Sequence, residues 1–135
     1  MPSTLGFVQA FAKFKAKPDN PMWACSAIAT DGSVVVSCWA HYFQKGGPGA
    51  LKYVDSLSRW TGNVPGNRLM RQHLEAAKAG DLPIRMVVAT AKDSELVEAV
   101  SDASKIEKTF HVRTDMVGKL TEFDGDNFVI EFTKS

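Results

Sequence analysis

The sequence predicts a single α+β domain built on antiparallel β-hairpins with flanking helices. Three observations lead to this fold class. The chain has 135 residues, 44% of them hydrophobic and 23% charged, which suits one globular domain over residues 1–135. One pair of β-prone stretches flanks Asp31-Gly32, and a second pair flanks Asp124-Gly125-Asp126. Helical periodicities separate the two pairs, so strands and helices mix along the chain.

The first expected element is a helix over residues 3–16. Ser3 can cap it, and Phe7, Phe11 and Phe14 recur with helical spacing to give one apolar stripe. Apolar and polar residues also alternate in this stretch, so a strand is the alternative. The prolines that follow end the element cleanly, which favours the helix.

The strongest local signal lies in residues 23–40. Asp31-Gly32 is typical of a two-residue type I′ turn, and such a turn fixes the register of the hairpin. In this register Cys25 lies directly opposite Cys38 on the apolar side of the hairpin. We therefore expect two reduced thiols packed in the core, with a redox-sensitive disulfide as the alternative.

The other side of the same hairpin is mixed. It combines small and branched residues with the side chains of Ser37, Trp39 and His41. A large aromatic ring beside a titratable ring indicates either contact with a second layer or a ligand-binding surface. These three residues form the alternative candidate ligand site, in which Trp39 is a wall and His41 an acid or base.

The middle of the chain is expected to hold two helices. The amphipathic residues 50–60 are assigned to the first of them. Asn67 can cap the second, which runs to Lys78 and stops at Gly80. The buried face of this second helix should consist of Met70, Leu74 and Ala77.

The last third of the chain adds strands and one more helix. Residues 83–91 are expected to form a buried strand, residues 95–103 a helix, and residues 109–113 a short strand. Residues 120–123 and 127–132 form a closing hairpin. One hydrophobic core is expected to contain Trp23, Val34, Val36, Met70, Leu74, Val87, Val88, Phe128 and Ile130.

The composition excludes several classes of protein. A net charge of +1 excludes a histone-like protein that is held to nucleic acid by bulk charge. No apolar run approaches the roughly 18 residues that span a bilayer, and the N-terminal residues lack the pattern of a secretory signal. Two cysteines are too few for a disulfide scaffold. We therefore expect a cytoplasmic protein that does not enter membranes.

Familiar catalytic signatures are absent from the sequence. It has no Gly-x-Gly-x-x-Gly, P-loop, Gly-x-Ser-x-Gly or His-Glu-x-x-His motif. Its three histidines are widely separated, and the turn at residues 124–126 is explained without a cation. We therefore expect no cofactor and no metal site, and a binding function is favoured over an enzymatic one.

Basic residues concentrate in residues 41–80. This segment has six basic and two acidic residues, whereas residues 81–135 have seven basic and eleven acidic ones. Arginine forks, amide side chains, an aromatic ring and a helix N-terminus are suited to phosphates and exposed base edges. In the alternative interpretation this is an ordinary solvated surface, with Trp60 in the core and Arg71 paired to Glu75. The candidate nucleic-acid-binding residues are Lys45, Arg59, Trp60, Asn63, Asn67, Arg68, Arg71 and Lys78.

Residues 20–91 combine a hairpin with aromatic and small residues, an Arg-Trp-Thr-Gly-Asn turn, a basic helix and a Val-Val-Ala-Thr strand. Together these features resemble the DNA-binding pseudobarrel domains of some restriction endonucleases and of plant transcription factors. A Trp-x-x-Ser-Ala…Asp-Gly…Trp arrangement in residues 23–39 is also similar to small uncharacterised bacterial and phage-borne proteins. The resemblance implies a pseudobarrel-like sheet and DNA contact through a positive arm that runs from Arg59 to Arg71.

The leading functional hypothesis is a nucleic-acid-binding domain that contacts double-stranded DNA in a restriction, anti-restriction or mobile-element setting. Basic side chains would hold phosphates, Trp60 would stack, and Asn63 or Asn67 would contact base edges. Two alternatives stay open. One is a small-molecule-binding protein or enzyme that uses the mixed hairpin face, and the other is a protein-interaction module anchored by Trp39 or Trp60.

Overall fold

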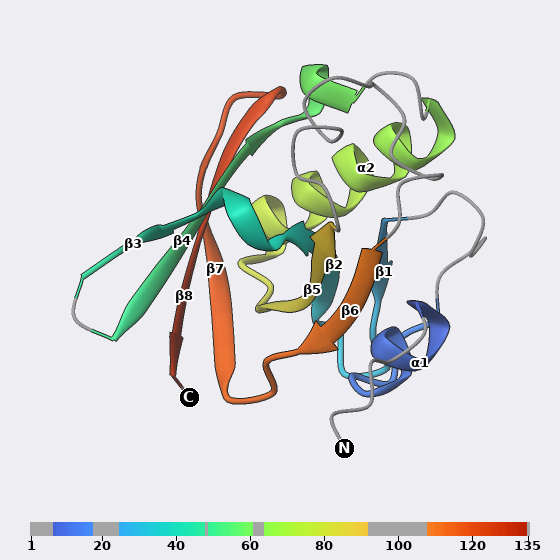
Figure 1. The fold of residues 1–135 in the computed structure, drawn as a ribbon. Helices are drawn as coiled ribbons and strands as arrows, with labels where there is room; N and C mark the ends of the chain where they lie inside the picture. Colours follow the sequence, from blue (N-terminus) through green and yellow to red (C-terminus); the bar gives the residue numbers. More distant parts are fainter. Residues whose placement is uncertain (1–6, 18–24, 48, 61–63, 92–107, 135) are drawn as a thin grey trace.

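Within the residues that the structure describes, eight strands form one open sheet, and two α-helices pack on it (Figure 1). This computed structural model describes residues 7–17, 25–47, 49–60, 64–91 and 108–134. Six side chains within these ranges, those of Phe7, His41, Arg59, Trp60, Ala91 and Lys108, are outside the description. The architecture within the described ranges is a mixed α+β fold, so the predicted fold class is confirmed.

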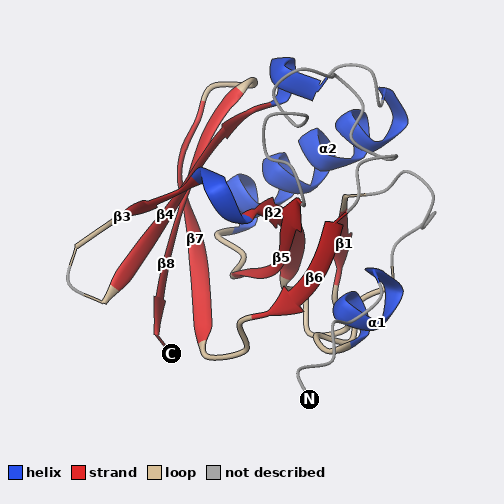
Figure 2. Cartoon of the chain, in the orientation of Figure 1, coloured by secondary structure: helices blue, strands red, loops and turns tan. Residues whose placement is uncertain are grey.

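The elements follow one another in a mixed order, shown by type in Figure 2. The first half contains α1 (Phe7–Ala12), β1 (Ser26–Ile28), β2 (Val34–Trp39), the 3₁₀ turn η1 (Ala40–Tyr42), β3 (Phe43–Lys45), β4 (Ala50–Ser56) and the 3₁₀ turn η2 (Leu57–Trp60). The second half contains α2 (Val64–Gly80), β5 (Ile84–Ala91), β6 (Lys108–Val112), β7 (Met116–Phe123) and β8 (Asn127–Lys134).

The strand order in the sheet is β1-β2-β5-β7-β8-β4-β3, and β6 also pairs with β5. All pairs are antiparallel except β2 and β5, which run parallel. A parallel pair needs a long crossover, and here the crossover carries the β3–β4 hairpin and α2. Figure 1 shows the outcome: β3, β4, β7 and β8 form one wing, and β1, β2, β5 and β6 form the other.

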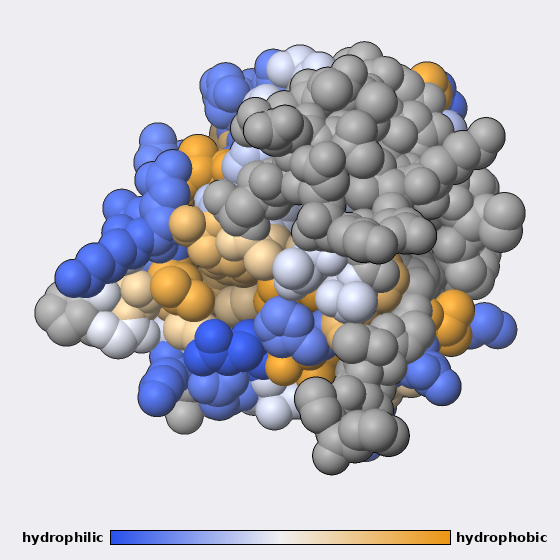
Figure 3. All heavy atoms as spheres, in the orientation of Figure 1, coloured by the Kyte–Doolittle hydropathy of each residue, from blue (hydrophilic) through white to orange (hydrophobic). Residues whose placement is uncertain are grey.

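Two hydrophobic clusters hold the layers together. The larger one lies between α2 and the sheet, and it contains Met70 and Leu74 of α2 together with Ile130 and Phe132 of β8. The smaller one lies on the opposite face of the second wing and contains Ala10, Phe11, Ala16, Ala27, Ala29, Val35 and Val87. Figure 3 shows that hydrophobic residues also gather on the surface in this view. Ala40, Tyr42, Phe43 and Leu51, which pack against the larger cluster, are only half-buried.

Several elements agree with the sequence-based expectations. Met70, Leu74 and Ala77 form the buried face of α2, which ends at Gly80 as predicted. The buried strand β5 and the closing hairpin β7–β8 are confirmed as well. Helix α1 is confirmed but ends at Ala12, because Lys15 takes a positive φ of 58° that no α-helix tolerates. The helix expected over residues 95–103 lies outside the described residues.

The prediction of a single core is wrong for Val87. Side chains alternate along β5, so Val88 faces the larger cluster and Val87 the smaller one beneath α1. Val34, Val36, Met70, Leu74, Val88, Phe128 and Ile130 do share one cluster, as expected. Trp23 lies outside the described residues.

The predicted register of the first hairpin is wrong by one residue. Ile28 pairs with Val34, and the N–H of Ala29 donates to the carbonyl of Ser33 at 2.8 Å, which leaves a three-residue loop. Gly32 closes this loop with a φ of 90°, the conformation of a glycine bulge.

This register separates the two cysteines. Cys25 lies opposite Ser37, whose N–H donates to the carbonyl of Cys25 at 2.8 Å. Cys25 and Cys38 therefore do not face each other, and neither is in a disulfide. The shift also moves each residue of the first strand to the opposite face of the hairpin relative to the second strand. Ser26, for example, shares a face with Val36 rather than with Ser37.

Residues 50–56 form a strand rather than the expected helix. β4 pairs with β3 on one side and β8 on the other, and Leu51 and Tyr53 pack on the larger cluster. β8 pairs along the whole of β4 and β3 pairs with its residues 51–53, so tertiary pairing overrides the helical spacing of its apolar residues. Helical geometry is confined to η2, which follows directly.

Candidate functional site

Helix α2 presents a basic side to solvent. Arg68, Arg71, Glu75 and Lys78 are all exposed. Arg68 and Glu75 lie on the side of the helix opposite its buried residues, and Arg71 and Lys78 lie on its flank. In the described part of the chain neither arginine has a hydrogen bond or ion pair, and the expected Arg71–Glu75 alternative is not formed. Two guanidinium groups are thus available to a ligand without the loss of an internal contact.

Lys78 extends this side toward the β7–β8 turn. Its Nζ donates a hydrogen bond to the carbonyl oxygen of Phe123 at 3.2 Å. The bond links the C-terminal half of α2 to the end of β7, so Lys78 both carries charge and holds the helix against the sheet. Its ammonium group keeps two further N–H donors for another partner.

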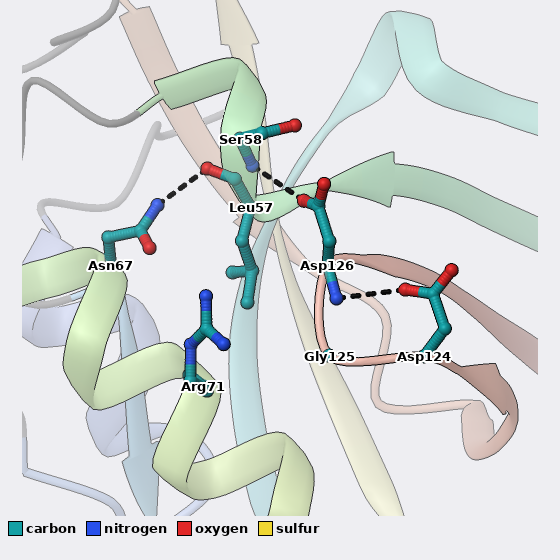
Figure 4. Close-up of a pocket in the computed structure, with 7 residues that line it drawn as sticks. All are labelled: Leu57, Ser58, Asn67, Arg71, Asp124, Gly125 and Asp126. Carbon is teal, nitrogen blue, oxygen red and sulfur yellow. Dashed lines mark hydrogen bonds between the residues drawn. The ribbon is translucent and has the colours of Figure 1, made fainter.

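A shallow depression of about 400 Å³ lies between α2, η2 and the β7–β8 turn (Figure 4). Arg71 points from α2 into this depression, between Asn67 and the turn at residues 124–126. The residues that line it are Leu57, Ser58, Asn67, Arg71, Asp124, Gly125 and Asp126. It therefore combines one cationic group with two carboxylates.

Both carboxylates already accept hydrogen bonds from the backbone. The N–H of Ser58 donates to Asp126 at 2.7 Å, and the N–H groups of Asp126 and Asn127 donate to Asp124 at 2.9 and 2.8 Å. These bonds lower the pKa of Asp124. Among the described residues no group of three or more His, Cys, Asp or Glu side chains is arranged to hold a metal ion.

Asn67 does not cap α2. The helix begins three residues earlier, at Val64, and the amide nitrogen of Asn67 donates to the carbonyl of Leu57 at 2.7 Å. The side chain therefore fixes η2 against the first turns of α2. Asn67 is a residue type that often caps helices, which is why the sequence suggests a start there. The helix instead begins at Val64, and Pro65 is compatible with its first turn.

The remaining candidate nucleic-acid-binding residues belong to β3, to η2 and to the segment that follows η2. Lys45 is exposed at the end of β3, in the hairpin that projects away from α2 in Figure 1. The backbone of Arg59 and Trp60 lies in η2, next to the depression, but their side chains and the whole of Asn63 lie outside the described residues. The structure thus brings Asn67, Arg68, Arg71 and Lys78 together on one helix and places Lys45 apart from them.

The alternative ligand face is only partly open. Ser37 and Trp39 are half-buried on the side of β2 that carries Val35 of the smaller cluster. The N–H of Trp39 donates to the hydroxyl of Tyr53 at 3.1 Å. His41 lies in η1, and its side chain lies outside the described residues.

One polar contact was not foreseen from the sequence. Nδ1 of His73 and the hydroxyl of the fully buried Ser26 are 2.7 Å apart, which joins α2 to the edge strand β1. His73 borders the buried stripe of α2, so helical spacing identifies it as half-buried. Its partner depends on how the helix lies across the sheet, which no local pattern reveals.

Comparison of the chain with family models, with curated proteins and with solved structures found no match. No helix among the described residues is both long and apolar enough to cross a membrane. The features of the molecule that bear on function are therefore the geometry and charge of α2 and its surroundings.

Proposed function

We propose that this protein binds nucleic acid, specifically double-stranded DNA, through the exposed side of α2. The observation that carries the proposal is the pair Arg68 and Arg71. Both are exposed, both belong to one 17-residue helix, and neither has a partner in the described part of the chain. Lys78 adds a third cation on the same helix.

These residue types suit a phosphate backbone. A guanidinium group donates several N–H bonds in a planar fork that matches two phosphate oxygens. A helix holds its side chains at fixed spacing before binding, so less conformational entropy is lost when several of them contact phosphates at once. The hydrogen bond between Lys78 and Phe123 further fixes the helix on the sheet.

The acidic turn limits the direction of approach. Asp124 and Asp126 line the depression on one side of Arg71, and their charges repel phosphate. DNA is therefore expected to approach over the exposed side of α2 that carries Arg68, with phosphates held by Arg71 and Lys78 at the helix surface rather than inside the depression. A cytoplasmic location belongs to the same proposal and is supported by the two cysteines of the chain, too few for a disulfide scaffold. The restriction, anti-restriction or mobile-element setting is supported only by the resemblance described above.

The proposal is tested by the salt dependence of binding to generic duplex DNA. Three phosphate contacts, from Arg68, Arg71 and Lys78, correspond to a slope of about −3 in a plot of log affinity against log salt concentration. Replacing Arg68 or Arg71 by alanine should make the slope shallower by about one unit each. Lys134→Ala removes an exposed charge from the end of β8 and should leave the slope unchanged.

Wild-type protein that shows no salt-dependent binding to duplex DNA at low ionic strength would refute the proposal. Equal effects of the α2 variants and of Lys134→Ala would mean that binding reflects net charge rather than this helix.

A further inference from the structure

The exposed surface of α2 divides into two rows. With 100° between successive residues, Met70, Leu74 and Ala77 define the buried direction, and the residues farthest from it are Pro65, Arg68, Gln72, Glu75 and Ala79. All five are exposed, and we call the last four, which lie beyond the first turn of the helix, the outer row. Arg71 and Lys78 lie between this row and the β7–β8 turn, as their contacts with the depression and with Phe123 show. We call these two residues the turn side.

The outer row carries three different hydrogen-bonding groups. Arg68 offers a donor fork, Gln72 a carboxamide, and Glu75 a carboxylate, at spacings of four and three residues. Within the described part of the chain none of the three has a hydrogen bond or ion pair to the protein. Side chains at i and i+4 or i+3 lie side by side along a helix, so the three groups form a continuous strip.

Nothing bulky in the described residues shields the C-terminal half of this strip. The other exposed positions there are Ala76, Ala79 and Gly80, whose small side chains leave the helix backbone close to the surface. Only Gly66, Met70, Leu74 and Ala77 of the whole helix are buried. Among the residues that the structure describes, α2 is thus uncovered over a wide arc.

We propose that the outer row of α2 enters the major groove of duplex DNA and contacts base edges, while the turn side contacts phosphates. This inference rests on the proposed function and adds the means of sequence recognition. An α-helix with its side chains is about 10–12 Å wide, close to the roughly 12 Å width of the major groove. The cations Arg68, Arg71 and Lys78 against the single anion Glu75 match the charge of the partner.

Each group of the outer row has a complementary base edge. A guanidinium fork donates to O6 and N7 of guanine, a carboxamide pairs with N6 and N7 of adenine, and a carboxylate accepts from N4 of cytosine. The bases contacted by Arg68, Gln72 and Glu75 should therefore include guanine, adenine and cytosine respectively. Cations on the flank contribute affinity without sequence preference.

The experiment selects preferred sequences from a randomised pool of duplex DNA, first with the wild-type protein. Affinities for the selected sequence and for a randomised duplex are then compared for each variant. Gln72→Ala should lower the preference for the selected sequence about 10-fold and leave the salt slope unchanged, because no charge is lost. Gln44→Ala, an exposed glutamine on β3, is the matched control and should change neither quantity.

Arg71→Ala distinguishes the role of the turn side from that of the outer row. It should weaken binding to both duplexes by the same factor and make the salt slope shallower by about one unit. Salt-dependent binding without sequence preference, or a preference that survives Arg68→Ala, Gln72→Ala and Glu75→Ala, would overturn this inference and leave the proposed function standing. Absence of any DNA binding by the wild-type protein would overturn both.

Discussion

The hydroxyl of Tyr53 accepts a hydrogen bond from the backbone N–H of Trp39 at 3.1 Å, although the strands that carry these residues are not neighbours in the sheet. The same hydroxyl donates to Oδ2 of Asp55 at 3.1 Å. Tyr53 is only 2% exposed, and its ring packs near Phe43 and Phe128. One side chain therefore links the two wings of the sheet at the point where β2 leads into η1.

Removing this hydroxyl should destabilise the protein without opening a large cavity. Tyr53→Phe is expected to lower the free energy of unfolding by about 1–3 kcal/mol, the usual cost of losing a buried hydrogen bond to a charged group. Urea denaturation measures the change. A double-mutant cycle with Asp55→Asn should give a non-zero coupling energy, and strictly additive effects would show that the Tyr53–Asp55 bond does not contribute.

The two cysteines should differ sharply in reactivity. Cys38 is fully buried, and burial, aided by the negative charge of Asp55, raises the pKa of its thiol well above the ordinary value. Since the thiolate is the reactive form, iodoacetamide should modify Cys38 only on unfolding, whereas the half-buried Cys25 should react earlier. Mass spectrometry of partly labelled protein tests this order. Equal rates in the folded protein and different rates in denaturant would contradict it.

Gly118 should not tolerate a side chain. A Cβ at this position would lie 2.5 Å from Cε1 of Phe132 and 2.9 Å from Cγ2 of Ile130, both in the larger cluster. Gly118→Ala should therefore cost about 1–3 kcal/mol through overpacking. Gly47→Ala is the control, because a Cβ there meets nothing within 4 Å, and it should change stability by less than about 0.5 kcal/mol. A Gly118→Ala protein as stable as the control would show that Phe132 can move aside.

The β7–β8 turn should weaken in acid. Hydrogen bonds from the N–H of Asp126, then from Asn127, lower the pKa of Asp124 below its ordinary value of 3.8. A carboxyl group whose pKa is lower in the folded state stabilises the protein above its unfolded pKa, and this contribution is lost as the pH falls through the folded pKa.

Melting temperatures recorded from pH 6 down to pH 2 test this sign. Asp124→Asn, which cannot ionise, should give a curve that falls less steeply below about pH 4 than the wild-type curve. Identical slopes for the two proteins would mean that Asp124 does not contribute, and a lowered pKa measured by NMR on the wild type provides an independent check.

The sequence pattern predicts correctly those elements whose structure does not depend on what they pack against. The buried residues of α2 follow from helical spacing, because its apolar side chains lie on one side of the helix and are buried by whatever layer packs there. The register of the first hairpin does not follow, because Asp31-Gly32 suits both a two-residue turn and a three-residue loop with a glycine bulge. The bond from the N–H of Ser33 to Asp31 at 2.9 Å stabilises the longer loop.

The candidate site was predictable in part for the same reason. The exposure of Arg68 follows from its position nearly opposite the buried stripe of α2, and Arg71 lies at the flank of that stripe, about 100° around the helix from Met70. The link between Ser58 and Asp126 does not, because it joins residues far apart in the chain that only the sheet order brings together. Helical spacing within α2 therefore identifies the cations, while the acidic border of the depression emerges only from the tertiary structure.

The position of β4 between β3 and β8 has a consequence for folding during synthesis. β3 and β4 can pair as soon as both have left the ribosome, but Ser56 pairs with Asn127, which is made much later. Non-local pairing of this kind slows folding, and an unpaired strand edge with apolar residues attracts other chains in the interval. Translation speed and chaperone supply, rather than the stability of the finished fold, should therefore govern how much of this protein a cell recovers in native form.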